Sequence, residues 1–66
     1  MTTERAFASR LINKLILMNL YGLTIELVVL DTRDNDSTSK VDLLVKPLNG
    51  AGTSWIDIAK MVAYEN

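Results

Sequence analysis

A glycine-rich segment at residues 49–54 is the sharpest candidate for binding chemistry in this sequence. Glycine lets backbone N–H groups approach an anion closely, and a helix that begins after such a loop favours phosphate at its N-terminus. The segment lacks the lysine of a Walker loop and the third glycine of a dinucleotide fingerprint. We therefore favour an ordinary loop that ends in a helix cap, and keep a weak nucleotide or phosphate site as the alternative. That site would use Asn49, Gly50, Gly52, Thr53, Ser54 and Lys46.

Catalytic chemistry has little support in the residue types. The chain has no cysteine and no histidine, which removes a thiolate nucleophile, an imidazole base and the commonest ligands of zinc and iron. Glu26 and Asp42 are expected on one face of a β-ribbon, but a chain of 66 residues rarely encloses the pocket that paired carboxylates need for acid–base work. Cross-strand ion pairing with nearby lysines explains them more simply. We expect no enzyme activity, no metal site and no cofactor.

Charge and hydropathy narrow the range of partners. Seven basic and eight acidic residues give a net charge of -1, which argues against a nucleic-acid partner. The N-terminus lacks the succession of charged, apolar and small residues of a signal peptide. We expect a cytoplasmic protein without membrane contact. The apolar stretch 11–30 is too polar for a membrane span because it contains Asn13, Lys14, Asn19, Gly22 and Glu26.

The elements that must position these residues begin with a predicted helix over Thr3–Tyr21, which Gly22 would stop. Its apolar side chains recur at spacings of three and four and cover about half of the circumference, which is wider than one core-facing stripe of roughly 100°. Because a single domain of 66 residues buries only about 60% of its unfolded surface, a partner chain is the supplement that remains. The wide apolar surface of this helix therefore predicts that a second face of the helix is buried against another molecule.

Two alternating segments predict an antiparallel hairpin. Apolar residues alternate with other residues over 23–30 and again over 40–47, and the nine residues between these segments are all polar. The register expected from this pattern pairs Leu23 with Pro47, Ile25 with Val45, Leu27 with Leu43, and Val29 with Val41. Two copies joined edge to edge would extend the ribbon to four strands, because free strand edges invite pairing.

The C-terminal segment allows two interpretations. As a helix, it starts at the N-cap Ser54 and carries Asp57 three residues on, a variant of the capping box. As strands, 54–58 and 61–65 flank a turn at Ala59-Lys60, which the Trp, Ile, Val and Tyr content favours. We prefer the helix by a small margin.

The strand interpretation has a resemblance attached to it. An N-terminal helix followed by short antiparallel strands, with the ending Trp55-Ile56-Asp57 … Met61-Val62-Ala63-Tyr64, resembles the Sm-like small barrels that form rings on RNA. The resemblance implies a five-stranded barrel, of which four strands are visible in the sequence. It also implies RNA binding in a ring, although the chain has no counterpart of the basic and histidine RNA contacts of the bacterial members.

We therefore expect one α+β domain over residues 1–66, with the order helix–strand–strand–helix and an antiparallel β-hairpin. It would complete its sheet or core by forming a homodimer or a higher homo-oligomer. The expected function is a small non-catalytic regulator, an adaptor or inhibitor of phage or mobile-element type that acts by binding another protein. The alternatives are an oligomeric binder of nucleotide or phosphate through the glycine-rich loop and an Sm-like RNA-binding ring protein. The interface would involve Phe7, Leu11, Leu15, Leu17, Met18, Val28, Leu30, Leu44, Trp55 and Tyr64.

Overall fold

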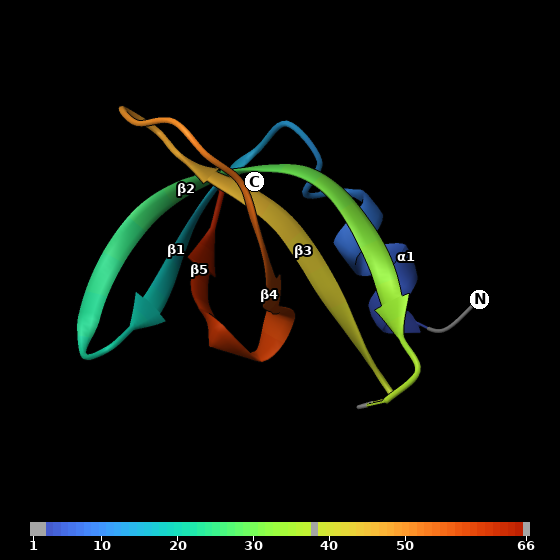
Figure 1. The fold of residues 1–66 in the computed structure, drawn as a ribbon. Coiled ribbons are helices and arrows are strands. Elements are labelled where there is room, and N and C mark those ends of the chain that lie inside the picture. The colour runs from blue at the N-terminus through green and yellow to red at the C-terminus, as the bar shows by residue number, and fades with distance from the viewer. Residues whose placement is uncertain (1–2, 38, 66) are drawn as a thin grey trace.

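The computed structural model describes residues 3–37 and 39–65, and most of them form β-structure. All the strands belong to one antiparallel sheet with the order β4-β3-β2-β1-β5 (Figure 1). The predicted helix–strand–strand–helix α+β fold is therefore wrong. The elements are α1 (Thr3–Ser9), β1 (Leu15–Leu20), β2 (Leu23–Asn35), β3 (Lys40–Pro47), β4 (Ser54–Asp57), the 3-10 turn η1 (Ile58–Lys60) and β5 (Met61–Tyr64).

The first correction concerns the long N-terminal helix, which ends at Ser9 instead of Tyr21. Two tight turns follow, in which Leu11 N–H donates to the Ala8 carbonyl at 2.9 Å and Lys14 N–H donates to the Leu11 carbonyl at 2.8 Å. Asn13 has a positive φ of 69°, a conformation that asparagine tolerates better than most residues. The chain thereby leaves the helical path and enters β1.

The second correction concerns residues 15–20, which were predicted as part of the helix but form the strand β1. Ile16 and Met18 are buried on its inner side, whereas Leu15 and Leu17 are half-buried on its outer side. Because nearly every residue here is apolar, the same letters fit a helical stripe and a strand alternation. The hydrogen-bonded partner strand, which a local pattern cannot reveal, decides for the strand.

The turn between β1 and β2 contains only Tyr21 and Gly22, since Leu20 pairs with Leu23. Both turn residues have a positive φ, 53° for Tyr21 and 79° for Gly22. A two-residue hairpin with positive φ at both positions matches the right-handed twist of its strands. Gly22 therefore serves a hairpin and does not stop a helix.

The predicted alternation in β2 and β3 is confirmed, but the predicted register is wrong. Val29 pairs with Val45 instead of Val41, and a bulge after Val29 shifts the pairing, so that Thr32 faces Leu43. Thr32 is buried with 8% of its surface exposed, and β2 continues through the polar residues to Asn35. Only residues 36–39 are left between the strands.

The C-terminal segment forms strands and not a helix, so the preferred interpretation is wrong and the alternative is confirmed. Ser54 begins β4 and caps nothing. The Asp57 carboxylate instead accepts a hydrogen bond from Ala59 N–H at 2.9 Å and so caps the short turn η1.

This short turn forces the sheet to curl. Asp57 ends β4 at one edge of the sheet, and Met61 begins β5 at the opposite edge. Across a flat sheet the two edge strands would lie about 19 Å apart, whereas four Cα–Cα steps reach about 14 Å at most. The sheet is therefore rolled into an open barrel (Figure 1).

The core fills the inside of this barrel, and α1 contacts β2 and β3. Arg5 NH1 donates to Asp34 Oδ2 at 2.7 Å and ties α1 to β2. Burying the apolar side chains inside the barrel is the main stabilising contribution to so small a domain. The buried apolar residues are Ala8, Leu11, Ile16, Met18, Leu27, Val29, Val41, Leu43, Val45 and Ile58.

Candidate functional site

The two edge strands of the barrel form the candidate site. Within the described residues, β4 pairs only with β3 and β5 pairs only with β1, so each has one free side. Trp55 on β4 and Val62 and Tyr64 on β5 are large apolar residues with 37%, 58% and 47% of their surfaces exposed. Free strand edges offer unpaired backbone groups, and exposed apolar side chains add area to bury. Each edge is therefore suited to pairing with another strand.

Trp55 is held in place on the outer face of the sheet. It lies opposite Leu44 of β3, and the guanidinium of Arg33 lies 4.2 Å from the centroid of its ring. Such a cation–π contact contributes about 0.5–1 kcal/mol at an exposed site. The ring is therefore fixed against the sheet before any partner binds.

The stack depends on a buried carboxylate. Asp42 has 5% of its surface exposed, and its Oδ2 accepts hydrogen bonds from Nε and NH2 of Arg33, both at 3.3 Å. Asn35 Nδ2 donates to the same oxygen at 3.0 Å. Because a buried charge is costly without partners, these donors fix both the carboxylate and the guanidinium.

Tyr64 is positioned on the other edge by the helix. Its ring makes an edge-to-face contact with Phe7 of α1, with the ring centroids 5.1 Å apart. Glu65, next along the chain, donates its N–H to the Leu15 carbonyl at 2.9 Å and so fixes the end of β5. Trp55 and Tyr64, two of the three aromatic residues expected at an interface, therefore lie on edge strands, whereas Phe7 lies on α1.

The other predicted interface residues are either buried in the core or half-buried. Leu11 and Met18 lie in the core, with 2% and 0% of their surfaces exposed, and present no surface to a partner. Phe7 is half-buried and packs against the core. The rest are half-buried residues of β1, β2 and β3, namely Leu15, Leu17, Val28, Leu30 and Leu44.

The glycine-rich loop does not form a basic cradle. It joins β3 to β4, so no helix begins after it, and Lys46 is absent from the cleft of about 270 Å³ that the loop covers. Thr53, Ser54 and Gly52 line that cleft, whereas Asn49 and Gly50 do not. All the remaining lining residues are apolar: Leu20, Ile25, Leu27, Val45, Pro47, Ala51 and Ile56. The geometry therefore does not favour phosphate at this loop.

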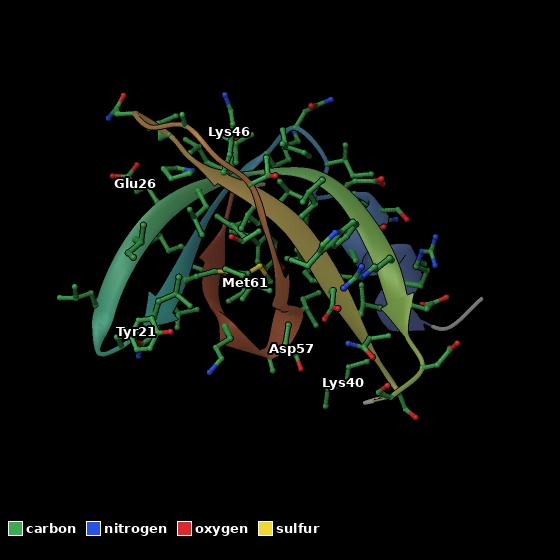
Figure 2. The ribbon with its side chains drawn as sticks, viewed as in Figure 1. Tyr21, Glu26, Lys40, Lys46, Asp57 and Met61 are labelled. Carbon is green, nitrogen blue, oxygen red and sulfur yellow. The ribbon has the colours of Figure 1, made fainter. Side chains whose placement is uncertain are left out.

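Sequence reasoning missed two features of the surface. The nine polar residues 31–39 were expected to separate the two strands, although Arg33 and Asn35 belong to β2 and meet Asp42. The sequence signal for this part of β2 was the alternation of Arg33 and Asn35 with Thr32 and Asp34. Tyr21 was assigned to a helix end, but it is fully exposed at the β1–β2 turn (Figure 2).

Other classes of site find no support in the part of the chain that the structure describes. Its acidic residues form no group that could hold a metal ion. None of its helices has the length and apolar character to cross a membrane. No protein-family model matches the sequence, and neither the curated proteins nor the solved structures give a significant match.

Proposed function

We propose that the protein is a small non-catalytic binding protein that assembles with copies of itself through the free edges of β4 and β5. The observation that carries this proposal is the position of Trp55, Val62 and Tyr64 on these two edges. An exposed apolar strand edge is an association site unless charge, proline or a covering element blocks it. Neither β4 nor β5 contains a proline or a lysine, and the carboxylate of Asp57 at the end of β4 accepts a hydrogen bond from Ala59 N–H.

A head-to-tail contact of β4 with β5 explains both edges together. The two strands have the same length of four residues. A two-fold contact of β4 with β4 would leave both β5 edges open, whereas a β4–β5 contact uses one edge of each kind on every copy. If the rotation between copies closes, a ring leaves no free edge. This contact is therefore the arrangement that we propose.

The assembled protein would act by contact with a second protein, as an adaptor or inhibitor in the cytoplasm. Assembly would display repeated copies of the half-buried apolar residues on the outside of the sheet, such as Leu17, Val28 and Leu44. Several weak contacts on one assembly strengthen each other through effective concentration. Such a function needs no catalytic group.

Light scattering coupled to gel filtration tests this proposal. We expect the natural chain to elute as an oligomer, and Val62→Lys to elute as a monomer because it places a charge on the β5 edge. Leu23→Lys is the matched control, since Leu23 has 65% of its surface exposed and lies outside β4 and β5. A natural chain that stays monomeric at millimolar concentration contradicts the proposal.

A second candidate is an Sm-like RNA-binding ring. The observation that favours it is the strand β1, which was not predicted. With β1, the chain has an N-terminal helix followed by the five strands that the resemblance implies. Retention of single-stranded RNA that weakens steeply as salt is raised would support this candidate. Absence of retention at low salt removes it and leaves the proposed self-assembly standing.

A further inference from the structure

A cleft between the end of α1 and the end of β5 is a second candidate site, which shares only Tyr64 with the free strand edges. It has a volume of about 400 Å³ and is lined by Phe7, Arg10, Leu11, Lys14, Tyr64 and Glu65. Ligand sites commonly measure about 300–1,000 Å³ and combine aromatic and aliphatic walls with a few polar groups. The cleft meets both conditions.

The charges around this cleft favour an anion. Arg10 is exposed and Lys14 is half-buried, and neither side chain has an ion pair within the described residues. Arg10 directly follows Ser9, the last residue of α1, where a cation also complements the negative end of the helix dipole. The Glu65 carboxylate is directed to the backbone, because its Oε1 accepts a hydrogen bond from Leu15 N–H at 3.3 Å. Two cations against one carboxylate leave a net positive rim.

The walls of the cleft favour a planar group. Leu11 forms a buried floor, and the ring of Phe7 meets the ring of Tyr64 edge to face. This contact holds the Tyr64 ring, which keeps 47% of its surface exposed. Any nucleobase can stack on an exposed aromatic ring, because every base has a flat π-face. A ring that is held in place and a pair of cations thus lie in one cleft.

We infer that this cleft binds a nucleoside monophosphate, with its base on Tyr64 and its phosphate between Arg10 and Lys14. The ligand is either a free nucleotide or the phosphorylated end of a single strand, since both present the same base and phosphate. This site shares Tyr64 with the β5 edge of the proposed self-assembly, whereas its two cations, Arg10 and Lys14, lie outside β4 and β5. Substitutions of Arg10 and Lys14 therefore test the site without changing either strand edge.

Nuclear magnetic resonance titration of the ¹⁵N-labelled protein tests the inference. The probes are adenosine and uridine monophosphates, inorganic phosphate, and a short RNA carrying either a 5′-phosphate or a 5′-hydroxyl. We expect the monophosphates to bind with a Kd of about 0.1–1 mM, a weak-ligand affinity. Their shifts should be confined to residues 7, 10–15 and 64–65. Tighter binding of the phosphorylated RNA than of the mononucleotide identifies a strand end as the source, and equal or weaker binding identifies the free nucleotide.

Charge-removing variants separate this site from a general attraction of anions. Arg10→Gln and Lys14→Gln should each raise the Kd about tenfold, the loss expected for one charge-assisted hydrogen bond. Lys60→Gln removes the same charge from η1, outside the cleft, and should leave the Kd unchanged. Light scattering should give the same oligomeric state for all three variants. The inference is overturned if 10 mM monophosphate causes no shifts, if inorganic phosphate binds as tightly, or if Lys14→Gln binds unchanged.

Discussion

The guanidinium of Arg33 lies 4.2 Å from the ring centroid of Trp55, and it also donates two hydrogen bonds to the buried Asp42. Three strands therefore meet in one contact, since Arg33 belongs to β2, Asp42 to β3 and Trp55 to β4. The buried carboxylate of Asp42 fixes the guanidinium of Arg33, and this guanidinium in turn holds Trp55 at the free β4 edge. The stack is thus both a stabilising contact and the support of the β4 edge.

Arg33→Ala should lower the free energy of unfolding by about 2 kcal/mol. The substitution removes the stack on Trp55 and two of the three donors to Asp42, so a buried carboxylate keeps only Asn35. Arg33→Lys should recover part of this loss, because lysine keeps the charge but not the planar fork. Urea unfolding at equilibrium measures both variants.

Arg10→Ala is the control for this loss, since Arg10 is exposed and has no ion pair within the described part of the chain. Its effect should stay within about 0.5 kcal/mol, the range of ordinary surface substitutions. If Arg33→Ala costs no more than Arg10→Ala, the network around Asp42 does not stabilise the fold.

Tyr21→Asn should raise the free energy of unfolding by about 0.5–1 kcal/mol. Tyr21 is fully exposed, so its ring contributes no packing, and its φ of 53° lies in the left-handed region that asparagine adopts more easily. The variant also creates an Asn-Gly pair with Gly22, the most favoured sequence for this hairpin turn. Thermal unfolding measures the gain, and Tyr21→Phe, which keeps the backbone cost, should match the natural chain. A loss of stability in Tyr21→Asn would contradict this account.

The fold could be predicted only where local alternation and burial agree. The inward set Leu27, Val29 and Val45 was predicted, because β-branched and apolar residues alternate there with a period of two. Residues 15–20 could not be assigned in the same way, since their almost continuous apolar run satisfies helix and strand together. Strand pairing with β2 and β5, a tertiary effect, decides their structure.

The register and the candidate site were predictable to different degrees. The bulge after Val29 could not be foreseen, because it brings the polar Thr32 into the core, where an apolar residue is expected. Trp55 and Tyr64 were singled out as interface residues because the chain has only four aromatic residues. Val62 was not, since its exposure depends on β5 being an edge strand.

Mixing two edge variants distinguishes a head-to-tail contact from a two-fold contact. Val62→Lys blocks the β5 edge, and the double variant Ser54→Lys, Trp55→Ser blocks the β4 edge. For a head-to-tail contact, each variant alone should be a monomer, and an equimolar mixture should form a dimer and stop there. Native mass spectrometry resolves these species. A dimer formed by Val62→Lys alone would show that β4 pairs with β4 and would refute the head-to-tail arrangement.

Dilution should shift the fluorescence of Trp55, the only tryptophan in the chain, to longer wavelength. Strand pairing at the β4 edge would cover part of the 37% of its surface that is exposed in the single chain, and dissociation would return that surface to water. Val62→Lys should show the long-wavelength emission at every concentration. The substitution lies on β5, but a blocked β5 edge cannot pair with the β4 edge of a neighbouring copy, so Trp55 of that copy stays exposed. Leu23→Lys should follow the natural chain. If light scattering records dissociation while the emission of Trp55 does not move, the β4 edge takes no part in the contact, and another surface must hold the copies together.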